Sequence, residues 1–193
     1  QKGGDVIFQL GTGKFGCRDE EGNFSEQAFS KIAAHEKVKM IELKLMQGAK
    51  PGKGGILPKE KITAEIAGIR KVPEGQDVLS PPRHAEFDDI AGLFSFLNRL
   101  RDLSEKPVGI KIVAGHVEEI EAIATAMAAE PQRGPDFITV DGGEGGTGAA
   151  PLVLASNAGV PMKQSIAMVD LALRKHGVRD RVHLLTSGQI ATP

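Results

Sequence analysis

Several residue types and patterns are scarce or absent in this sequence. Of its 193 residues only Cys17 is a cysteine, and tryptophan and tyrosine are missing. A single cysteine excludes an internal disulfide and a multi-cysteine metal or iron-sulfur site, and it predicts a reducing, cytoplasmic location. The longest apolar run, residues 122–129, falls far short of the roughly 20 residues that span a bilayer. We therefore expect no membrane partner.

An excess of charge of one sign is lacking as well, because 24 Lys and Arg residues nearly balance 25 Asp and Glu residues. Nucleic acid and anionic membranes bind basic surfaces, so neither is an expected partner. The 40% hydrophobic and 25% charged residues are typical of a globular domain rather than a disordered chain. The chain begins at Gln1 without an initiator Met, and we interpret residues 1–193 as one partial domain of a longer protein.

Glycine, in contrast, is abundant: the chain has 24, about 12% of its residues, against roughly 7% in average proteins. Short apolar runs bounded by glycine or proline predict strands buried on both faces, with helices between them. The predicted strands are Val6–Leu10, Met40–Leu45, Val108–Val113, Phe137–Val140 and Val182–Leu185, with a sixth candidate at Val78–Ser80. The predicted helices are Phe87–Leu103, Glu118–Met127 and Ile166–Leu173. This alternation indicates an α/β fold, and periodicity alone leaves open a doubly wound sheet and a (β/α)8 TIM barrel.

Polar or glycine-rich loops follow three of the predicted strands, at Gln47–Gly55, Asp141–Gly148 and Ser187–Gly188. In a barrel these strand ends converge on the face that carries the active site, which favours the barrel. A complete barrel typically needs about 250 residues, so we expect an incomplete one that lacks its terminal strands.

The loop Gln47–Gly55 contains four glycines and two lysines, one of them Lys50. Glycine lets backbone amides approach an anion or a flat ring. A flexible surface loop with solvated lysines is the alternative. The pattern by itself leaves both readings open.

The run Gly142–Gly148 holds five glycines in seven residues and follows a predicted strand directly. It has neither the Gly-Lys-Ser/Thr of a P-loop nor the spacing of a Rossmann fingerprint. Each ordered glycine costs about 0.5–1 kcal/mol relative to alanine. We therefore interpret the run as a wall of backbone that faces a planar or anionic ligand.

Lys111 interrupts the apolar strand Val108–Val113. Such a lysine reaches solvent at a strand edge, pairs with a carboxylate or points into a polar cavity, and a barrel interior provides the cavity. The histidines show no metal-ligand spacing, so we predict no metal site. His84 follows the rigid Ser80-Pro81-Pro82 and is either exposed or presented to a pocket.

Five segments in one order carry a resemblance to a known family. They are Gly11-Thr12-Gly13 with Phe15–Arg18, Gln47–Gly55, Ser80-Pro81-Pro82, Lys111 in its strand, and Asp141–Pro151. The sequence resembles the flavin-binding synthase domain of glutamate synthase, most closely the short single-chain FMN-binding glutamate synthase family proteins. The resemblance covers nearly the whole chain.

The resemblance implies an oxidoreductase with a TIM barrel that binds FMN and converts 2-oxoglutarate and ammonia, through 2-iminoglutarate, to L-glutamate. It assigns Lys50, Gln47 and Arg70 to catalysis and 2-oxoglutarate binding. It assigns cofactor binding to Lys111, Asp141, Gly142, Gly143, Ser187 and Gly188. The electron donor would be ferredoxin or a nicotinamide-linked partner. The cysteines that hold the family's iron-sulfur cluster are absent from this chain.

Two other readings remain open at this point. The chain could use FMN on another 2-oxo or 2-hydroxy acid, or it could be a non-catalytic ligand-binding subunit, because a fold does not determine function. We also expect that an unclosed barrel exposes strand edges and that the fragment therefore self-associates.

Overall fold

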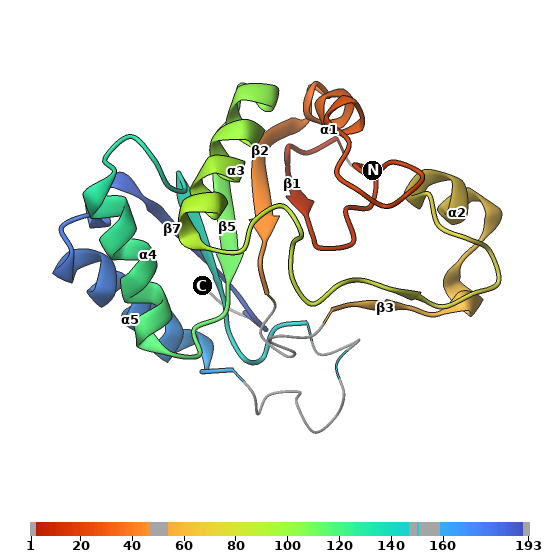
Figure 1. Cartoon of the computed structure of the whole chain (residues 1–193). Coiled ribbons are helices and arrows are strands. Elements are labelled where there is room, and N and C mark those ends of the chain that lie inside the picture. The colour runs from red at the N-terminus through yellow and green to blue at the C-terminus, as the bar shows by residue number, and fades with distance from the viewer. Residues whose placement is uncertain (1–2, 47–53, 147–149, 151–158, 191–193) are drawn as a thin grey trace.

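The computed structural model describes residues 3–46, 54–146, 150 and 159–190 (Figure 1). The large sheet contains β1 (Val6–Leu10), β2 (Val38–Lys44), β5 (Val108–Ile112), β6 (Phe137–Asp141) and β7 (His183–Ser187). Its helices are α1 (Glu26–Ala33), α3 (Ile90–Ser104), α4 (Val117–Ala129) and α5 (Met162–Lys175). An excursion between β2 and α3 adds β3 (Ile56–Leu57), α2 (Ala64–Arg70) and β4 (Val78–Leu79), and short 3-10 turns lie at Lys59–Lys61 and Arg179–Arg181.

The strands of the large sheet are all parallel and follow one another in chain order, β1-β2-β5-β6-β7. A doubly wound sheet reverses its strand order at a switch point, and these five strands do not. Right-handed crossovers that always advance in one direction place their helices on one face of the sheet, as in a barrel. The α/β fold with a parallel sheet is therefore confirmed. Closure into a (β/α)8 barrel stays a prediction, as does a single domain over 1–193.

The sixth strand candidate, Val78–Ser80, is wrong as a member of the large sheet. Val78 and Leu79 form β4, which pairs antiparallel with β3 in a separate two-stranded sheet. This small sheet and α2 stand away from the large sheet, to the right of β1 in Figure 1. Two apolar residues can predict a strand but not the neighbouring strand with which it pairs. That pairing depends on how the chain folds in space.

Local capping explains where the helices begin. The side chain of Asp89 accepts a hydrogen bond from the Gly92 amide at 2.7 Å, which satisfies an amide at the start of α3. The helices α1 and α2 were not among the predicted elements, although Ser25 and Thr63 cap them in the same way. Both have fewer than nine residues, so their apolar periodicity is too short to stand out.

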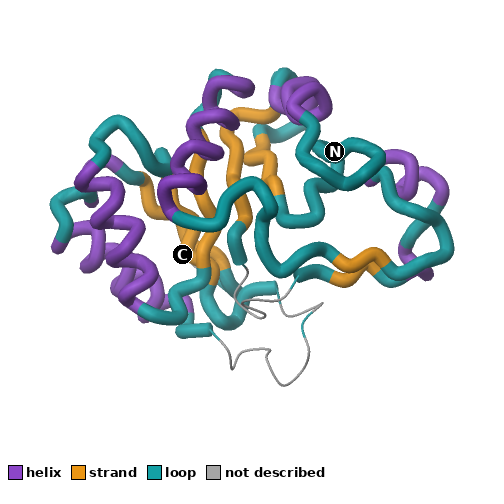
Figure 2. The backbone as a smooth tube through the Cα atoms, viewed as in Figure 1, coloured by secondary structure: helices purple, strands orange, loops and turns teal. Residues whose placement is uncertain are grey.

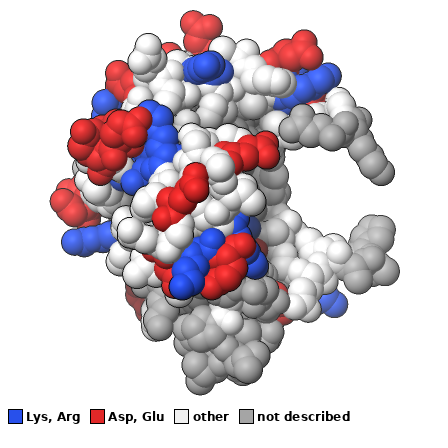
Figure 3. Space-filling view, turned by 90° about the vertical axis from the view of Figure 1, so that its right-hand side faces the viewer, with Lys and Arg blue, Asp and Glu red and all other residues white. Residues whose placement is uncertain are grey.

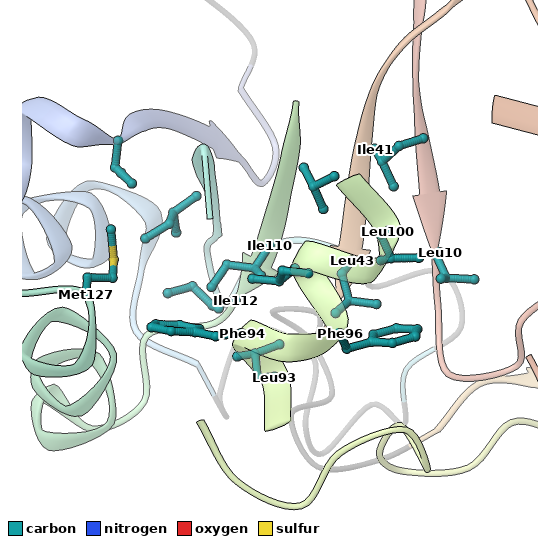
Figure 4. Close-up of a cluster of buried hydrophobic side chains, with 14 of the residues drawn as sticks. Leu10, Ile41, Leu43, Leu93, Phe94, Phe96, Leu100, Ile110, Ile112 and Met127 are labelled. Atoms are coloured by element: carbon teal, nitrogen blue, oxygen red, sulfur yellow. The ribbon is translucent and has the colours of Figure 1, made fainter. Parts of the chain in front are cut away.

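One face of the large sheet packs against the helices and forms the main core (Figures 2 and 4). In this core Leu43 and Ile110 from the sheet and Phe94 from α3 are fully buried. Alternate residues of a strand point to opposite faces, so the apolar positions of β2 and β5 face the helices and their polar positions face the other way. Phe24 and Phe96 add an edge-to-face contact with ring centroids 5.2 Å apart.

The edges and surface of the molecule bear on its partners. β1 and β7 lie at the two edges of the large sheet, and Val6 and Ile7 on β1 are exposed. Self-association through these edges stays a prediction.

Acidic and basic side chains are interspersed on the face shown in Figure 3. Among the described residues no helix is long and apolar enough to cross a membrane, and no group of three His, Cys, Asp or Glu side chains could hold a metal ion.

Cys17 is expected to be chemically inert in the folded protein. Its side chain is fully buried, and burial raises the pKa of the thiol from 9.0 to about 12. The thiolate is the reactive form, so at pH 8 a thiol reagent should modify the native protein about 100-fold more slowly than the same protein in denaturant. Equal rates in the two states would contradict the burial of Cys17.

Candidate functional site

Polar side chains cover the sheet face that lies opposite the helices. On β2 the residues Glu42 and Lys44 alternate with the core residues Ile41 and Leu43. The same alternation places one polar row across five strands. Its members are Gln9, Glu42, Lys44, Lys111, Thr139, Asp141 and Ser187. A sheet face this polar is suited to line a site rather than a second apolar core.

Lys111, Asp141 and Ser187, which the sequence predicted as cofactor-binding residues, meet at the carboxyl ends of β5, β6 and β7. The ammonium of Lys111 lies 3.3 Å from Oδ1 of Asp141, and the Ser187 hydroxyl donates to the same oxygen at 2.6 Å. The side chain of Asp141 is 3% exposed and that of Lys111 is 16% exposed. Of the three options for Lys111, pairing with a carboxylate is the one observed, and the pair stands on the polar face.

A second hydrogen-bonded group lies deeper on this face. Glu42, which is buried, accepts a hydrogen bond from Gln9 at 2.6 Å and another from the hydroxyl of Thr139. The register partner of Glu42 on β5 is Gly109, and the ring of Phe137 fills the space that a side chain at position 109 would occupy. These contacts connect the strands below the site and stabilise its floor.

Lys44 is a site residue that the sequence reasoning missed. It is the register partner of Lys111 on the neighbouring strand, so the two side chains share one face at the same height. Its signal in the sequence was weaker than that of Lys111, because its strand also holds Glu42 and alternates polar with apolar residues. Position 44 lies at the strand end, where an exposed lysine is common, and the signal was therefore overlooked.

A pocket of about 250 Å³ opens at the carboxyl ends of β1 and β2. Residues of four segments line it, among them Gln9, Gly11–Phe15, Lys44–Met46, Gly54, Gly55, Ser80 and Pro82. Among the described residues that line it, the charged side chains are Lys14, which is paired with Glu86, and Lys44. Lysine side chains at a pocket suit an anionic ligand.

Glycine is required where the pocket loops touch. A Cβ added to Gly54 would lie 1.7 Å from the carbonyl oxygen of Ser80, and one added to Gly13 would lie 2.6 Å from the Ser80 hydroxyl. The Ser80 amide also donates to the carbonyl of Gly55 at 2.8 Å. Backbone contacts of this kind bring the glycine-rich loop after β2 and the loop after β4 together.

The described glycines after β6 pack against the protein itself. The amide of Gly142 donates to the Ser187 carbonyl at 3.0 Å, and that of Gly143 donates to the Val160 carbonyl at 2.9 Å. Glu144 accepts from the Met162 amide at 3.1 Å at the start of α5. Close packing accounts for these glycines, and their predicted contact with a ligand stays a prediction.

The remaining predicted residues have different placements. Gln47 and Lys50 lie outside the described residues. Arg70 ends α2, and its guanidinium lies over the ring of Phe15 at 4.9 Å from the centroid. Phe15 lines the pocket, so Arg70 lies beside it. Gly188, with φ at +123°, follows Ser187, whose hydroxyl is directed to Asp141; a role of either residue toward a phosphate stays a prediction.

Comparison with known proteins agrees with these motifs. A family model described as the conserved region in glutamate synthase matches residues 1–193. The chain belongs to the glutamate synthase family. The predicted resemblance is confirmed by this match over the whole chain.

Relatives in the family carry related names. The glutamate synthase large subunit-like protein YerD of Bacillus subtilis is 41% identical over 99% of the chain and 36% of that protein. An archaeal glutamate synthase [NADPH] of Methanocaldococcus jannaschii is 39% identical over 96% of the chain and 33% of that protein. The ferredoxin-dependent glutamate synthase of Pyropia yezoensis is 34% identical over 99% of the chain and 12% of that protein. The chain thus spans about a third of the length of the first two.

Proposed function

We propose that this chain forms the FMN-binding and 2-oxoglutarate-binding part of an oxidoreductase that makes L-glutamate from 2-oxoglutarate and ammonia. Family membership supports the reaction. The observation that carries the proposal for these residues is the placement of Lys44 and Lys111 as register partners at the carboxyl end of the sheet, beside a pocket that Lys14 and Lys44 line.

The charges of the site suit an anionic substrate. Like charges on neighbouring strands repel one another, and a bound anion between them would relieve that repulsion. Asp141 is paired with Lys111, and Lys44 and Lys14 are among the described residues that line the pocket. A dicarboxylate such as 2-oxoglutarate would pair one carboxylate with Lys44, and the other with Lys14 or with the neighbouring Arg70.

The residues present fit the ring of FMN. Lys111 offers a cation on the polar face, partly exposed and held by Asp141, where it would stabilise negative charge on a reduced flavin ring. Bound FMN would supply a hydride to the imine that 2-oxoglutarate forms with ammonia. In this proposal Gly142, Gly143, Ser187 and Gly188 border the cofactor. The proposal keeps Gln47 and Lys50, which lie outside the described residues, as the catalytic and 2-oxoglutarate-binding residues that the resemblance assigns.

The electron donor is proposed by class. The name of one relative mentions NADPH and that of another mentions ferredoxin. We infer that the electron donor here is one of these two kinds. The single cysteine of the chain cannot hold an iron-sulfur cluster. Any cluster in the electron path would therefore be bound by residues outside this sequence.

The proposal is tested with the intact protein. Its visible spectrum should contain flavin bands at about 450 nm. After chemical reduction the flavin should reoxidise when 2-oxoglutarate and ammonium are added together. Omission of ammonium is the control and should leave the flavin reduced. Reoxidation by another 2-oxo acid in place of 2-oxoglutarate would favour a different substrate. A protein without flavin bands after purification with added FMN would contradict the proposal.

A further inference from the structure

A buried ion pair connects the pocket to the loop between β4 and α3. The ammonium of Lys14 lies 3.1 Å from Oε1 of Glu86, and the two side chains are 7% and 11% exposed. Lys14 adopts a positive φ of 52°, a conformation that is uncommon outside glycine. Lys14 also lines the pocket, so the pair fixes one of the cations in the pocket wall.

His84, two residues before Glu86, reaches the other wall. Its Nε2 lies 2.9 Å from the carbonyl oxygen of Lys44, and since a carbonyl oxygen only accepts, Nε2 donates this hydrogen bond. The imidazole is buried and stacks on the ring of Phe87 with centroids 5.6 Å apart. Its Nδ1 lies 3.7 Å from the second oxygen of Glu86. The imidazole thus holds the backbone at the end of β2, from which the side chain of Lys44 extends.

One loop therefore touches both cationic walls of the pocket. Ser80 and Pro82 of this loop line the pocket themselves, and two consecutive prolines stiffen the segment just before His84. Burial by itself raises the pKa of Glu86, but the neighbouring His84 and Lys14 lower it to about 2. Glu86 is thus ionised at neutral pH.

We propose that Glu86 and His84 are positioning residues that hold Lys14 and Lys44 at a fixed separation for a dicarboxylate substrate. This inference rests on the proposed function of the pocket. Two ammonium groups that line one pocket can pair with both ends of a dianion, whereas a monocarboxylate engages one of them. We call the Lys14–Glu86 ion pair and the hydrogen bond from His84 to the Lys44 carbonyl the clamp. Loss of the clamp should weaken binding of 2-oxoglutarate far more than it affects the use of ammonia.

The clamp itself is tested by amine labelling, without any assay of activity. In the intact wild-type protein, trace acetylation followed by mass spectrometry should modify Lys14 at least about tenfold more slowly than the exposed Lys163. In Glu86→Gln, which keeps the shape but loses the charge, Lys14 should react nearly as fast as Lys163. An unchanged rate for Lys14 would overturn the proposed clamp.

The consequence for the substrate is tested by steady-state kinetics. In Glu86→Gln and in His84→Leu the KM for 2-oxoglutarate should rise about tenfold or more, with the KM for ammonium changed less than about twofold. Glu86→Asp, which retains the carboxylate, and His84→Gln, whose amide can still donate to the Lys44 carbonyl, should recover most of the affinity. Equal increases in both KM values would indicate general damage and would contradict the positioning role.

The two experiments separate the two proposals. If the wild-type protein shows no turnover of 2-oxoglutarate, the proposed function fails, while the labelling of Lys14 still reports on the clamp. If turnover is normal and the labelling or the KM values do not change in the variants, the positioning role fails and the proposed function stands.

Discussion

Replacement of Lys111 by methionine is expected to lower kcat/KM for glutamate formation by about 100-fold or more. The variant removes the cation that we place beside the flavin and leaves the buried carboxylate of Asp141 without its 3.3 Å partner. Breaking a buried pair from one side costs about 3 kcal/mol of folding free energy. Turnover and denaturant unfolding measure the two effects separately, and the potential of any bound flavin should fall by about 30 mV or more.

A matched double variant distinguishes the two effects of this change. Lys111→Met with Asp141→Asn removes both charges and keeps the shape of Asp141, so its stability should return to within about 1 kcal/mol of the wild type. The loss of turnover and the lowered flavin potential should persist. Recovery of turnover in the double variant would mean that Lys111 only neutralises Asp141 and does not act on the flavin.

The second large effect is expected for Gly54→Ala. The added Cβ would lie 1.7 Å from the Ser80 carbonyl oxygen and 2.8 Å from that of Pro81, and neither backbone atom can yield as a flexible side chain would. The two pocket loops must separate, and a displacement of about 1 Å at a binding site costs about 100-fold in kcat/KM. The loss should appear in kcat/KM for 2-oxoglutarate.

Gly55→Ala is the control for this prediction. A Cβ at Gly55 would lie 3.7 Å from the Ser80 hydroxyl, which is an ordinary contact, so kcat/KM should change less than about threefold. Similar losses in both variants would show that the close approach of Gly54 to Ser80 does not shape the pocket.

Much of the large sheet was predictable because its signals are local. The apolar runs around Ile41, Ile110 and Ile138 each formed a strand of the parallel sheet, with ends within two or three residues of the prediction. The N-cap of α3 is Asp89, a residue type that favours helix starts. The family motifs were equally readable, since they are continuous in the sequence. The strands β3 and β4 were not predictable as a pair, because two residues are too few to show a hydrophobic period.

The candidate site was predictable only in part. Lys111 stood out by its local setting and the resemblance named Asp141 and Ser187, whereas their meeting depends on the register of β5, β6 and β7. Lys14 and Glu86 are 72 positions apart in the sequence, and neither drew attention by itself. Their ion pair exists because the loop after β4 folds back onto the end of β1.

The sequence by itself determined the parallel α/β character, the three longest helices and the family, because hydrophobic period and continuous motifs are properties of neighbouring residues. Only the tertiary structure decided which charges share a site. Strand register brought Lys44 beside Lys111, and the close approach of Gly54 to Ser80 brought the pocket loops together. Contacts between residues distant in the chain depend on the path of the backbone through space, and no local pattern encodes that path.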